Sequence, residues 1–425
     1  MAILTTLLLA VASVTSQGEA SRSVLAGPVN PVVQWNRTLL LILRTPGAQP
    51  PTIHPTRSFA MLHGAIYDAV NAIDRTHAPY VVNLPGAFRR ASEDAAAAAA
   101  AHGVLVALYP VFKPTLDTEL QQSLAQVAGA AERAEGVRIG QAVADQILTL
   151  RSHDGSSAAP IPYVFGTSPG AYQSTPPNFP LQPQFTHWSS VMPFALRRAN
   201  QFRPGPPPAL DSNQYSRALS EVTAVGIADS QTATPDQALV GRFWNGAIQN
   251  YWNEIAQTAS DAHRLTTADS ARLFALLNLS IADSVIAFYD AKYVYNFWRP
   301  VTAIRAADAD SNENTTADVN WLPEVGTTGA DPSYPGAHAV VSAAAAEVLS
   351  SLLTQHFVFA VVSEALPGTT RRFTSFPAAA REASLSRVFA GQHFRFDETA
   401  GSALGRDVAG FVVNHFLTPV HDDGR

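Results

Sequence analysis

Residues 92–101, Ser-Glu-Asp followed by seven alanines (SEDAAAAAAA), decide the class of fold. A serine that precedes acidic residues is typical of a helix N-cap, and alanine is the strongest helix former. Apolar positions recur with a helical period of about 3.6 residues in other windows, namely 59–70, 136–150 and 216–227. Strand signals, which alternate with a period of two, are scarce. The sequence therefore predicts an all-α protein.

The composition excludes several classes of function. The 425-residue chain has no cysteine, which rules out disulfides, thiolate metal sites and a cysteine nucleophile. It carries 28 Lys and Arg against 34 Asp and Glu, a net charge of −6, and has no basic block. We therefore expect no nucleic-acid partner, because phosphate contacts need clustered cations. With 47% hydrophobic residues, the chain has ample material for a large core.

Residues 1–20 contain an apolar run, 3–12, followed by small and polar residues. This pattern is typical of a secretory signal segment, although no Lys or Arg precedes the run. We expect a secreted or periplasmic protein, and a cytoplasmic location stays open. No later stretch reaches the roughly 20 uninterrupted apolar residues that a membrane span needs. We therefore expect no transmembrane span.

A proline-rich stretch divides the rest of the chain. Residues 160–208 contain 12 prolines together with Trp188 and several phenylalanines. Flexible linkers are poor in aromatic residues, so we expect an ordered loop that packs across the helices near the mouth of a site. This loop belongs to an N-terminal helical part, 21–210, and a C-terminal helical part, 211–425, follows it. We expect the two parts to form one unit.

The first of three segments that carry chemistry is 292–300, Lys-Tyr-Val-Tyr-Asn-Phe-Trp-Arg-Pro. Lys292 and Arg299 lie about 20° apart on one face if the helix is continuous up to Pro300. Two cations framed by aromatic rings are costly to bury unless an anion neutralises them. The pair therefore indicates an anion site. The alternatives are two solvated side chains or partners for Asp283 and Asp290.

The second segment is 331–342, where two prolines and a glycine form a turn that leads into a helix over 339–353. The first backbone N–H groups of a helix and the positive end of its dipole suit an oxyanion. These groups fall beside Gly336, Ala337 and His338. His338 could act there as a general acid or base. Taken by itself, a histidine in a first turn is more often a cap or a surface residue.

The third segment is 386–397. His393 and Asp397 are spaced so that, on a helix, the carboxylate holds one imidazole nitrogen and leaves the other free. An imidazole oriented in this way can act as a nucleophile or as a metal ligand. Arg387 adds a third cation to the set. The alternative is a structural His–Asp pair on a helix.

Together, in order and spacing, the three segments resemble the signature of one superfamily. It unites vanadium-dependent haloperoxidases with type 2 phosphatidic acid phosphatases and bacterial non-specific acid phosphatases. Its signature is a Lys followed, after six residues, by Arg-Pro, then Pro-Ser-Gly-His, then Ser-Arg with a His and an Asp beyond it. The matching positions are Lys292, Arg299-Pro300, 335–338, Ser386-Arg387, His393 and Asp397. The segments 67–70 and 296–305 are most similar to the soluble haloperoxidase-like branch.

The resemblance implies two four-helix bundles with long ordered loops, and a site built from the C-terminal bundle. It implies that His393 ligates vanadium, as vanadate, or attacks phosphorus in a phosphatase, while Asp397 orients its ring. His338 would be the acid–base residue. The oxyanion would be bound by a set of cations and amides, namely Lys292, Arg299, Gly336, Ala337 and Arg387. Vanadate is the implied cofactor of a peroxidase, and a phosphatase needs none.

Gly336 and Ala337 stand where the signature has Ser and Gly. The missing hydroxyl would have donated a hydrogen bond to the anion, a loss of about 1.5–3 kcal/mol. We expect the Gly336 and Ala337 amides to stay available. A Gly336→Ser substitution is then expected to raise vanadate affinity.

Three functions are compatible with the resemblance. The favoured one is a haloperoxidase that oxidises halide with hydrogen peroxide. The second is a phosphatase, for which the expected absence of a membrane span disfavours a lipid substrate. The third is a non-catalytic oxyanion-binding helical protein, which the glycine at 336 supports. The expected partners are small molecules: peroxide, halide and an organic acceptor, or a phosphate ester. Histidines other than His338 and His393 are expected to be structural or exposed.

Overall fold

Helices account for nearly all regular structure in the computed structural model, which describes residues 30–354 and 356–420. Within these ranges the chain forms 13 α-helices, three short 3₁₀ segments and one two-stranded hairpin. The predicted all-α class is confirmed. The hairpin, β1 (Phe359–Val362) antiparallel to β2 (Thr370–Phe373), is an addition that the sequence reading missed. The expected signal segment, 1–20, lies outside the described residues.

The N-terminal helices form the first bundle. They are α1 (Pro31–Arg44), α2 (Thr56–Asp74), α3 (Glu93–Leu108), α4 (Lys113–Ala125) and α5 (Ala130–Arg151). Ser92 caps α3 as expected, because its Oγ accepts a hydrogen bond from the Ala95 amide (3.2 Å). The buried alanines of α3 pack between α2 and α5. On α5, a Cβ at Gly140 would overlap the Ala96 carbonyl oxygen, so small residues on both helices permit this close approach.

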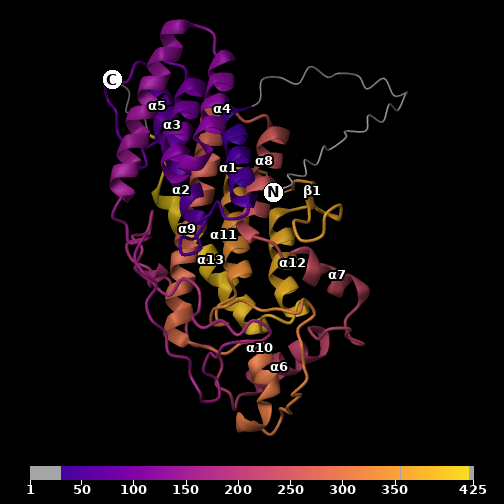
Figure 1. Ribbon diagram of the computed structural model, residues 1–425. Coiled ribbons are helices and arrows are strands. Elements are labelled where there is room, and N and C mark those ends of the chain that lie inside the picture. Colours follow the sequence, from indigo (N-terminus) through magenta and orange to yellow (C-terminus); the bar gives the residue numbers. More distant parts are fainter. Residues whose placement is uncertain (1–29, 355, 421–425) are drawn as a thin grey trace, which may run out of the picture.

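The second bundle is built from four helices of the C-terminal half. They are α9 (Thr267–Tyr295), α11 (Ala337–Leu352), α12 (Phe376–Phe389) and α13 (Arg395–His415). α9 packs against α2 of the first bundle as well as against α11 and α13, so it belongs to both. Figure 1 shows the N-terminal helices gathered at one end of the molecule and α6 and α10 at the other. The helical-bundle architecture that the resemblance implies is therefore present.

Shorter elements connect and cover the bundles. They are α6 (Asn213–Val225), α7 (Pro235–Phe243), α8 (Ile248–His263), α10 (Pro300–Arg305) and the 3₁₀ segments Pro110–Phe112, Trp188–Ser190 and Ala307–Ala309. One large apolar core extends from Val32 in α1 to Leu417 beyond α13, through both bundles. A division of the chain at 210 stays a prediction.

The proline-rich stretch 160–208 runs along α9. Asp283, buried in α9, accepts hydrogen bonds from the amides of Phe194, Ala195 and Leu196 at 2.6–2.7 Å. Further along, the Tyr172 amide donates to the Asn296 carbonyl oxygen, and the Gln184 amide donates to that of Ala330 (2.7 Å each). Specific hydrogen bonds therefore hold this irregular segment against α9 and the loop that precedes α11.

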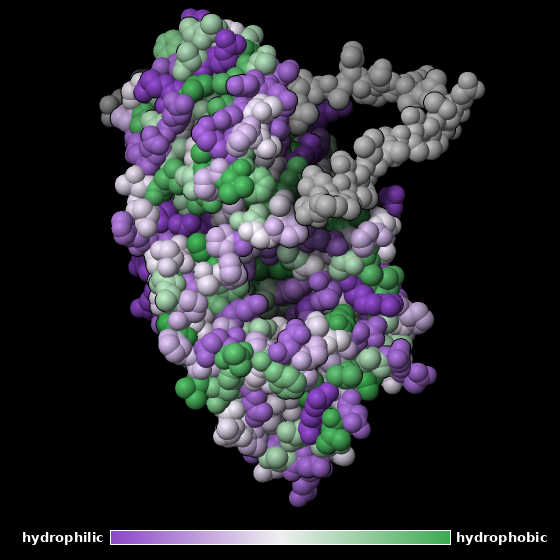
Figure 2. All heavy atoms as spheres, in the orientation of Figure 1, coloured by the Kyte–Doolittle hydropathy of each residue, from purple (hydrophilic) through white to green (hydrophobic). Residues whose placement is uncertain are grey.

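α9 is the one described helix that is long and apolar enough to cross a membrane, with a mean hydropathy of 1.6 over its best window. The sequence reading did not single out α9 as a candidate, and polar residues such as Asn278 and Asp283 interrupt its apolar residues. That window is 94% buried inside the protein, which explains its composition: α9 is the central core helix. On the face shown in Figure 2, hydrophilic and hydrophobic residues are intermixed and form no continuous apolar band.

Candidate active site

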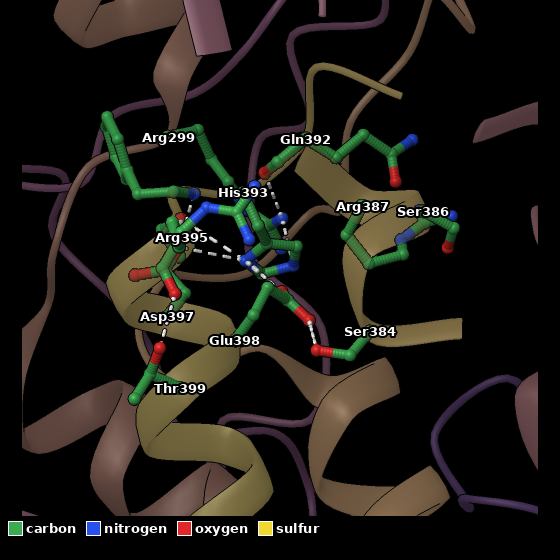
Figure 3. Close-up of polar contacts among 12 residues, drawn as sticks. Arg299, Ser384, Ser386, Arg387, Gln392, His393, Arg395, Asp397, Glu398 and Thr399 are labelled. Carbon is green, nitrogen blue, oxygen red and sulfur yellow. Dashed lines mark hydrogen bonds and ion pairs between the residues drawn. The ribbon is translucent and has the colours of Figure 1, made fainter. Parts of the chain in front are cut away.

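The structure brings all eight predicted site residues together at the end of the second bundle nearest α6 and α10. They come from the end of α9 (Lys292), the residue before α10 (Arg299), the start of α11 (Gly336, Ala337, His338), the last turn of α12 (Arg387) and the start of α13 (His393, Asp397). Figure 3 shows Arg299, Arg387, Asp397 and Glu398 surrounding His393.

A small aromatic core fixes two of these segments to each other. The Phe394 and Phe396 rings stack with centroids 4.9 Å apart, and Phe297 meets both edge-on at 5.8 and 5.7 Å. These rings are neighbours of the polar residues in the sequence: Phe297 lies near Arg299, Phe394 follows His393 and Phe396 precedes Asp397. Aromatic packing therefore sets the distance between Arg299 and His393.

Lys292 and Arg299 do not share a helix face. α9 ends at Tyr295, where Asn296 adopts a left-handed conformation (φ 47°), and Arg299 follows in extended backbone before Pro300 starts α10. The prediction of one continuous helix up to Pro300 was wrong, because an asparagine tolerates the left-handed cap that ends a helix. The two cations still converge.

Lys292 and Arg299 both bond to the loop 331–333. Lys292 Nζ donates to the carbonyl oxygens of Pro332 and Ser333 and lies 3.6 Å from Asp331 Oδ2. Arg299 pairs with the Asp331 carboxylate, and its Nε donates to the Asp331 carbonyl oxygen (2.8 Å). Burial lowers the pKa of Lys292 to about 8, while Asp331 acts in the opposite direction. Lys292 is completely buried and Arg299 nearly so, which excludes two solvated side chains.

The other expected partners are engaged elsewhere. Asp290 forms an ion pair with Arg203 (2.6 Å), and Asp283 accepts the three amides of the proline-rich stretch. Neither aspartate therefore explains the two buried cations.

His393 is held by both ring nitrogens. Its Nδ1 lies 3.0 Å from Asp397 Oδ2, and its Nε2 lies 2.9 Å from Arg299 Nη1. A guanidinium can only donate, so Nε2 must accept and the ring proton must sit on Nδ1, where it is donated to Asp397. Burial and the surrounding cations hold the pKa of His393 well below its usual range. The ring is therefore neutral, and its Nε2 electron pair accepts from Arg299.

Asp397 reaches His393 from the first turn of α13. The helix begins only at Arg395, so the prediction that the two residues are paired on one continuous helix was wrong. Asp397 Oδ2 also accepts from the Ser333 hydroxyl (2.5 Å) and from the Phe394 amide (3.1 Å). Burial raises the pKa of Asp397 to about 6, and these donors oppose the shift. Ser333 thus supports the orientation of the dyad.

His338 lies in the first turn of α11; the residue keeps some exposure to solvent, but its ring is surrounded by protein atoms. Its Nε2 donates to the Trp244 carbonyl oxygen (3.0 Å), which leaves Nδ1 as the nitrogen that can accept a proton. Burial of the ring and the nearby Arg387 guanidinium hold the pKa of His338 well below its usual range. A neutral imidazole with one free nitrogen is suited to act as a general base.

The amides at the start of α11 are only partly available. The Gly336 amide donates to the Asp397 carbonyl oxygen (3.0 Å), so the expectation that it stays available was wrong. No acceptor within 30–354 and 356–420 bonds to the Ala337 amide. Gly336 itself has an ordinary φ of −72°, so its backbone conformation does not require glycine. A Cβ there would overlap Glu398 Oε1, so a serine must displace Glu398 and the expected gain in vanadate affinity no longer follows.

Arg387 has one buried N–H group, on Nε, that makes no hydrogen bond within the described part of the chain. Both Nη atoms lie 3.3 Å from Asn245 Oδ1. Burial, together with the charge of Arg299, lowers the pKa of Arg387 to about 10. An unpaired buried donor on a cation is costly unless a ligand accepts from it.

The donor set fits an oxyanion. It consists of three buried cations, the free Ala337 amide and the unpaired Arg387 Nε. In the described residues, no group of three or more His, Asp and Glu side chains is arranged to hold a bare metal cation. These residues would hold an oxyanion: the cations and the two donors would bind its oxygens, and His393 Nε2 is the available ligand or nucleophile.

Sequence reasoning missed several residues of this site, namely Asn245, Asp331, Ser333 and Glu398. Asp331 and Ser333 lie inside the segment that was singled out for its turn. Glu398 directly follows Asp397, and an acidic pair beside three expected cations was a usable signal. Asn245 lies between α7 and α8, far from every motif, and no sequence feature pointed to it.

Comparison with known proteins agrees with this geometry. Residues 272–422 match the family described as the VCPO second helical-bundle domain. The chain is 24% identical to the vanadium chloroperoxidase of Curvularia inaequalis, over 89% of this chain and 80% of that protein.

Solved structures extend the likeness to the fold. The crystal structure of a bacterial vanadium-dependent iodoperoxidase matches with a TM-score of 0.78 and 26% identity, covering 93% of this chain and 98% of that one. The holo form of a bacterial vanadium-dependent chloroperoxidase matches with a TM-score of 0.64 and 16% identity, covering 88% and 96%. The second bundle, the fold and these relatives support the resemblance to the vanadium haloperoxidase superfamily that the three segments carry, and they indicate an enzyme of that type.

Proposed function

We propose that the protein is a vanadate-dependent haloperoxidase that oxidises halide with hydrogen peroxide. The observation that carries this proposal is the neutral His393, whose Nε2 accepts from Arg299 and whose ring lies within the field of Lys292 and Arg387. The hydrogen bond from Nδ1 to Asp397 fixes this tautomer and raises the basicity of Nε2 as a ligand. Bound vanadate would supply Lewis-acid activation of hydrogen peroxide toward halide.

The other residues take roles that follow from their contacts. Lys292, Arg299 and Arg387 neutralise the charge on the oxygens of the anion, and they do so without reorganisation because they are already held in place. The free Ala337 amide adds a neutral donor. His338, with Nδ1 free and its ring neutral, takes a proton from incoming hydrogen peroxide. His393 would be the residue that holds vanadate, through its Nε2.

A phosphatase uses the same constellation differently, with His393 Nε2 as the nucleophile. The neutral ring supports this second candidate, since a protonated imidazole cannot attack phosphorus. The two functions differ in their response to vanadate, which activates a haloperoxidase and inhibits a phosphatase.

The test is a titration of the purified protein with orthovanadate. Bromide and iodide oxidation by hydrogen peroxide is assayed beside hydrolysis of a phosphate ester. We expect halide oxidation that requires vanadate and is lost in His393→Ala. The matched control is His153→Ala, because His153 is exposed on the first bundle. Hydrolysis that vanadate inhibits would favour the phosphatase, and neither activity would favour an oxyanion-binding protein without turnover.

A further inference from the structure

Glu398 is a buried residue beside the site, and one of its carboxyl oxygens lacks a hydrogen-bond partner in the described chain. It lies in the first turn of α13 and is 2% exposed. Its Oε2 accepts from the Ser384 hydroxyl (3.2 Å), whereas Oε1 has no hydrogen-bond partner in the described chain. Oε1 lies 3.9 Å from His393 Nδ1, the ring nitrogen that Asp397 holds, so the carboxyl group borders the His393–Asp397 pair.

The same carboxyl group fills the space beside Gly336. A Cβ built on Gly336 would overlap Glu398 Oε1 and lie 2.7 Å from its Cδ, far inside van der Waals contact. Position 336 is where the signature of the resembling superfamily carries serine. Glycine at 336 and glutamate at 398 are therefore sterically linked: the carboxyl group stands where a side chain at 336 would stand.

The surroundings of Glu398 leave Oε1 no other described partner. Glu398 also lines a groove of about 900 Å³ between α11, α12 and α13, whose walls include Ala343, Ala380 and Ser402. Figure 2 shows a hollow where α11 and α12 run side by side in Figure 1. The side chain is nevertheless almost fully buried, so the groove does not hydrate it well. An unpartnered buried oxygen is costly unless a ligand bonds to it.

We infer that Glu398 contacts the bound oxyanion in the place of the missing side chain at 336, and that it sets the affinity of the site for that anion. This inference rests on the proposed function only in that the site binds an oxyanion. A hydrogen bond between a carboxyl group and an oxygen of vanadate or phosphate needs one proton, which either group can carry. The exchange of serine for glycine thus moves a contact from α11 to α13 and does not delete it.

The test is a set of binding measurements that needs no turnover. Isothermal titration with orthovanadate, and separately with inorganic phosphate, is carried out on the full chain and on the variants Glu398→Gln, Glu398→Ala, Gly336→Ser and the double variant Gly336→Ser/Glu398→Ala. Glu347→Ala is the matched control, because Glu347 lines the same groove on α11 and is not part of the site. Melting temperatures are recorded for all.

We expect Glu398→Ala to weaken binding of both anions by about 10- to 100-fold, the loss of one hydrogen bond to a charged group. Glu398→Gln should stay within about threefold, because the amide fills the same space and can still donate or accept a hydrogen bond. Gly336→Ser should weaken binding, since it displaces the carboxyl group, and the double variant should regain most of the affinity. Glu347→Ala should bind as the wild type does.

Several results would overturn the inference. One is unchanged affinity with a lowered melting temperature in Glu398→Ala, which would mark a purely structural role. Another is tighter binding in both Glu398 variants, which would mean that the carboxylate repels the anion. If Gly336→Ser does not fold, Gly336→Ala provides the same steric challenge and must weaken binding. A wild type that binds vanadate but oxidises no halide contradicts the proposed function alone; one that binds neither anion contradicts both.

Discussion

Arg299 Nη1 lies 2.9 Å from His393 Nε2, the ring nitrogen opposite the one that Asp397 holds. The same guanidinium bonds to the Asp331 carboxylate and to the carbonyl oxygens of Asp331 and Gln392. Its planar fork is therefore locked before any ligand arrives, and it keeps the imidazole neutral by its charge. This arrangement holds the guanidinium and Nε2 in a fixed relation, and in the proposed function Arg299 would both bind the anion and orient Nε2 toward it.

Arg299→Lys is therefore expected to be damaging although the charge is kept. An ammonium on a flexible stem cannot make the guanidinium's contacts to Asp331, Gln392 and His393 at once. Vanadate affinity, measured by titration calorimetry, should fall at least about tenfold, which is about 1.4 kcal/mol. Arg305→Lys is the control, because among the residues that the structure describes Arg305 donates only to the Trp321 carbonyl oxygen. Equal affinities for both variants would contradict the assigned role.

Asp397→Asn should uncouple His393 from its orientation. The amide can still accept from Ser333, but it loses the charge that holds the Nδ1 proton. Losing such an outer partner of a metal-binding histidine costs roughly 10- to 100-fold in affinity or activity. Vanadate titration of this variant should be compared with that of Asp407→Asn, an exposed position on the same helix. A loss no larger than the control's would show that the dyad is not needed.

Buried histidines predict how stability depends on pH. Burial lowers the pKa of His63 to about 3; its Nε2 contacts Asn36 Oδ1 (2.8 Å), and its ring stacks on Phe274. The unfolded chain takes up this proton near pH 6.5 and the folded chain does not, so stability is full above pH 6.5 and is lost as pH falls toward 3. Between pH 6.5 and 5 this amounts to about 2 kcal/mol for His63.

Denaturant unfolding at a series of pH values checks this prediction. His63→Gln should reduce the slope of unfolding free energy against pH in that window, whatever its effect at neutral pH. His153→Gln, at an exposed position, should leave the slope unchanged. Identical slopes for wild type and His63→Gln would refute the assignment of a buried neutral ring.

Two glycines in helices should respond in opposite ways to alanine. At Gly140, a Cβ would overlap the Ala96 carbonyl oxygen and lie 2.8 Å from the Ala100 amide nitrogen, so α3 and α5 must separate. Gly140→Ala should lower the free energy of unfolding by about 1–3 kcal/mol. Gly410 in α13 has open space at its Cβ position, so Gly410→Ala should raise it by about 0.5–1 kcal/mol. Denaturant unfolding of the two variants and the wild type measures both changes in the free energy of unfolding.

The sequence predicted those features that depend on residues close together in the chain. The cap at Ser92, the alanine helix behind it and the three site segments are of this kind. The path of the backbone between segments could not. Asn296 ends α9 before Arg299, and His393 lies ahead of α13, so both face-sharing arguments failed although the side chains still meet. Loop 331–333 and the aromatic contacts of Phe297 bring these side chains together. Both depend on packing between elements that are distant in the sequence.

Because α9 packs in both bundles, neither bundle should be soluble when it is expressed alone. One side of the helix lies against α2 and the other against α11 and α13, and almost all of its apolar surface is covered by one or the other. A fragment that carries only the matched domain, 272–422, would therefore expose to water the side that α2 covers, and it should aggregate when expressed alone. Co-expression with a fragment that ends before α9 should rescue its solubility, since the missing helices would again cover that side.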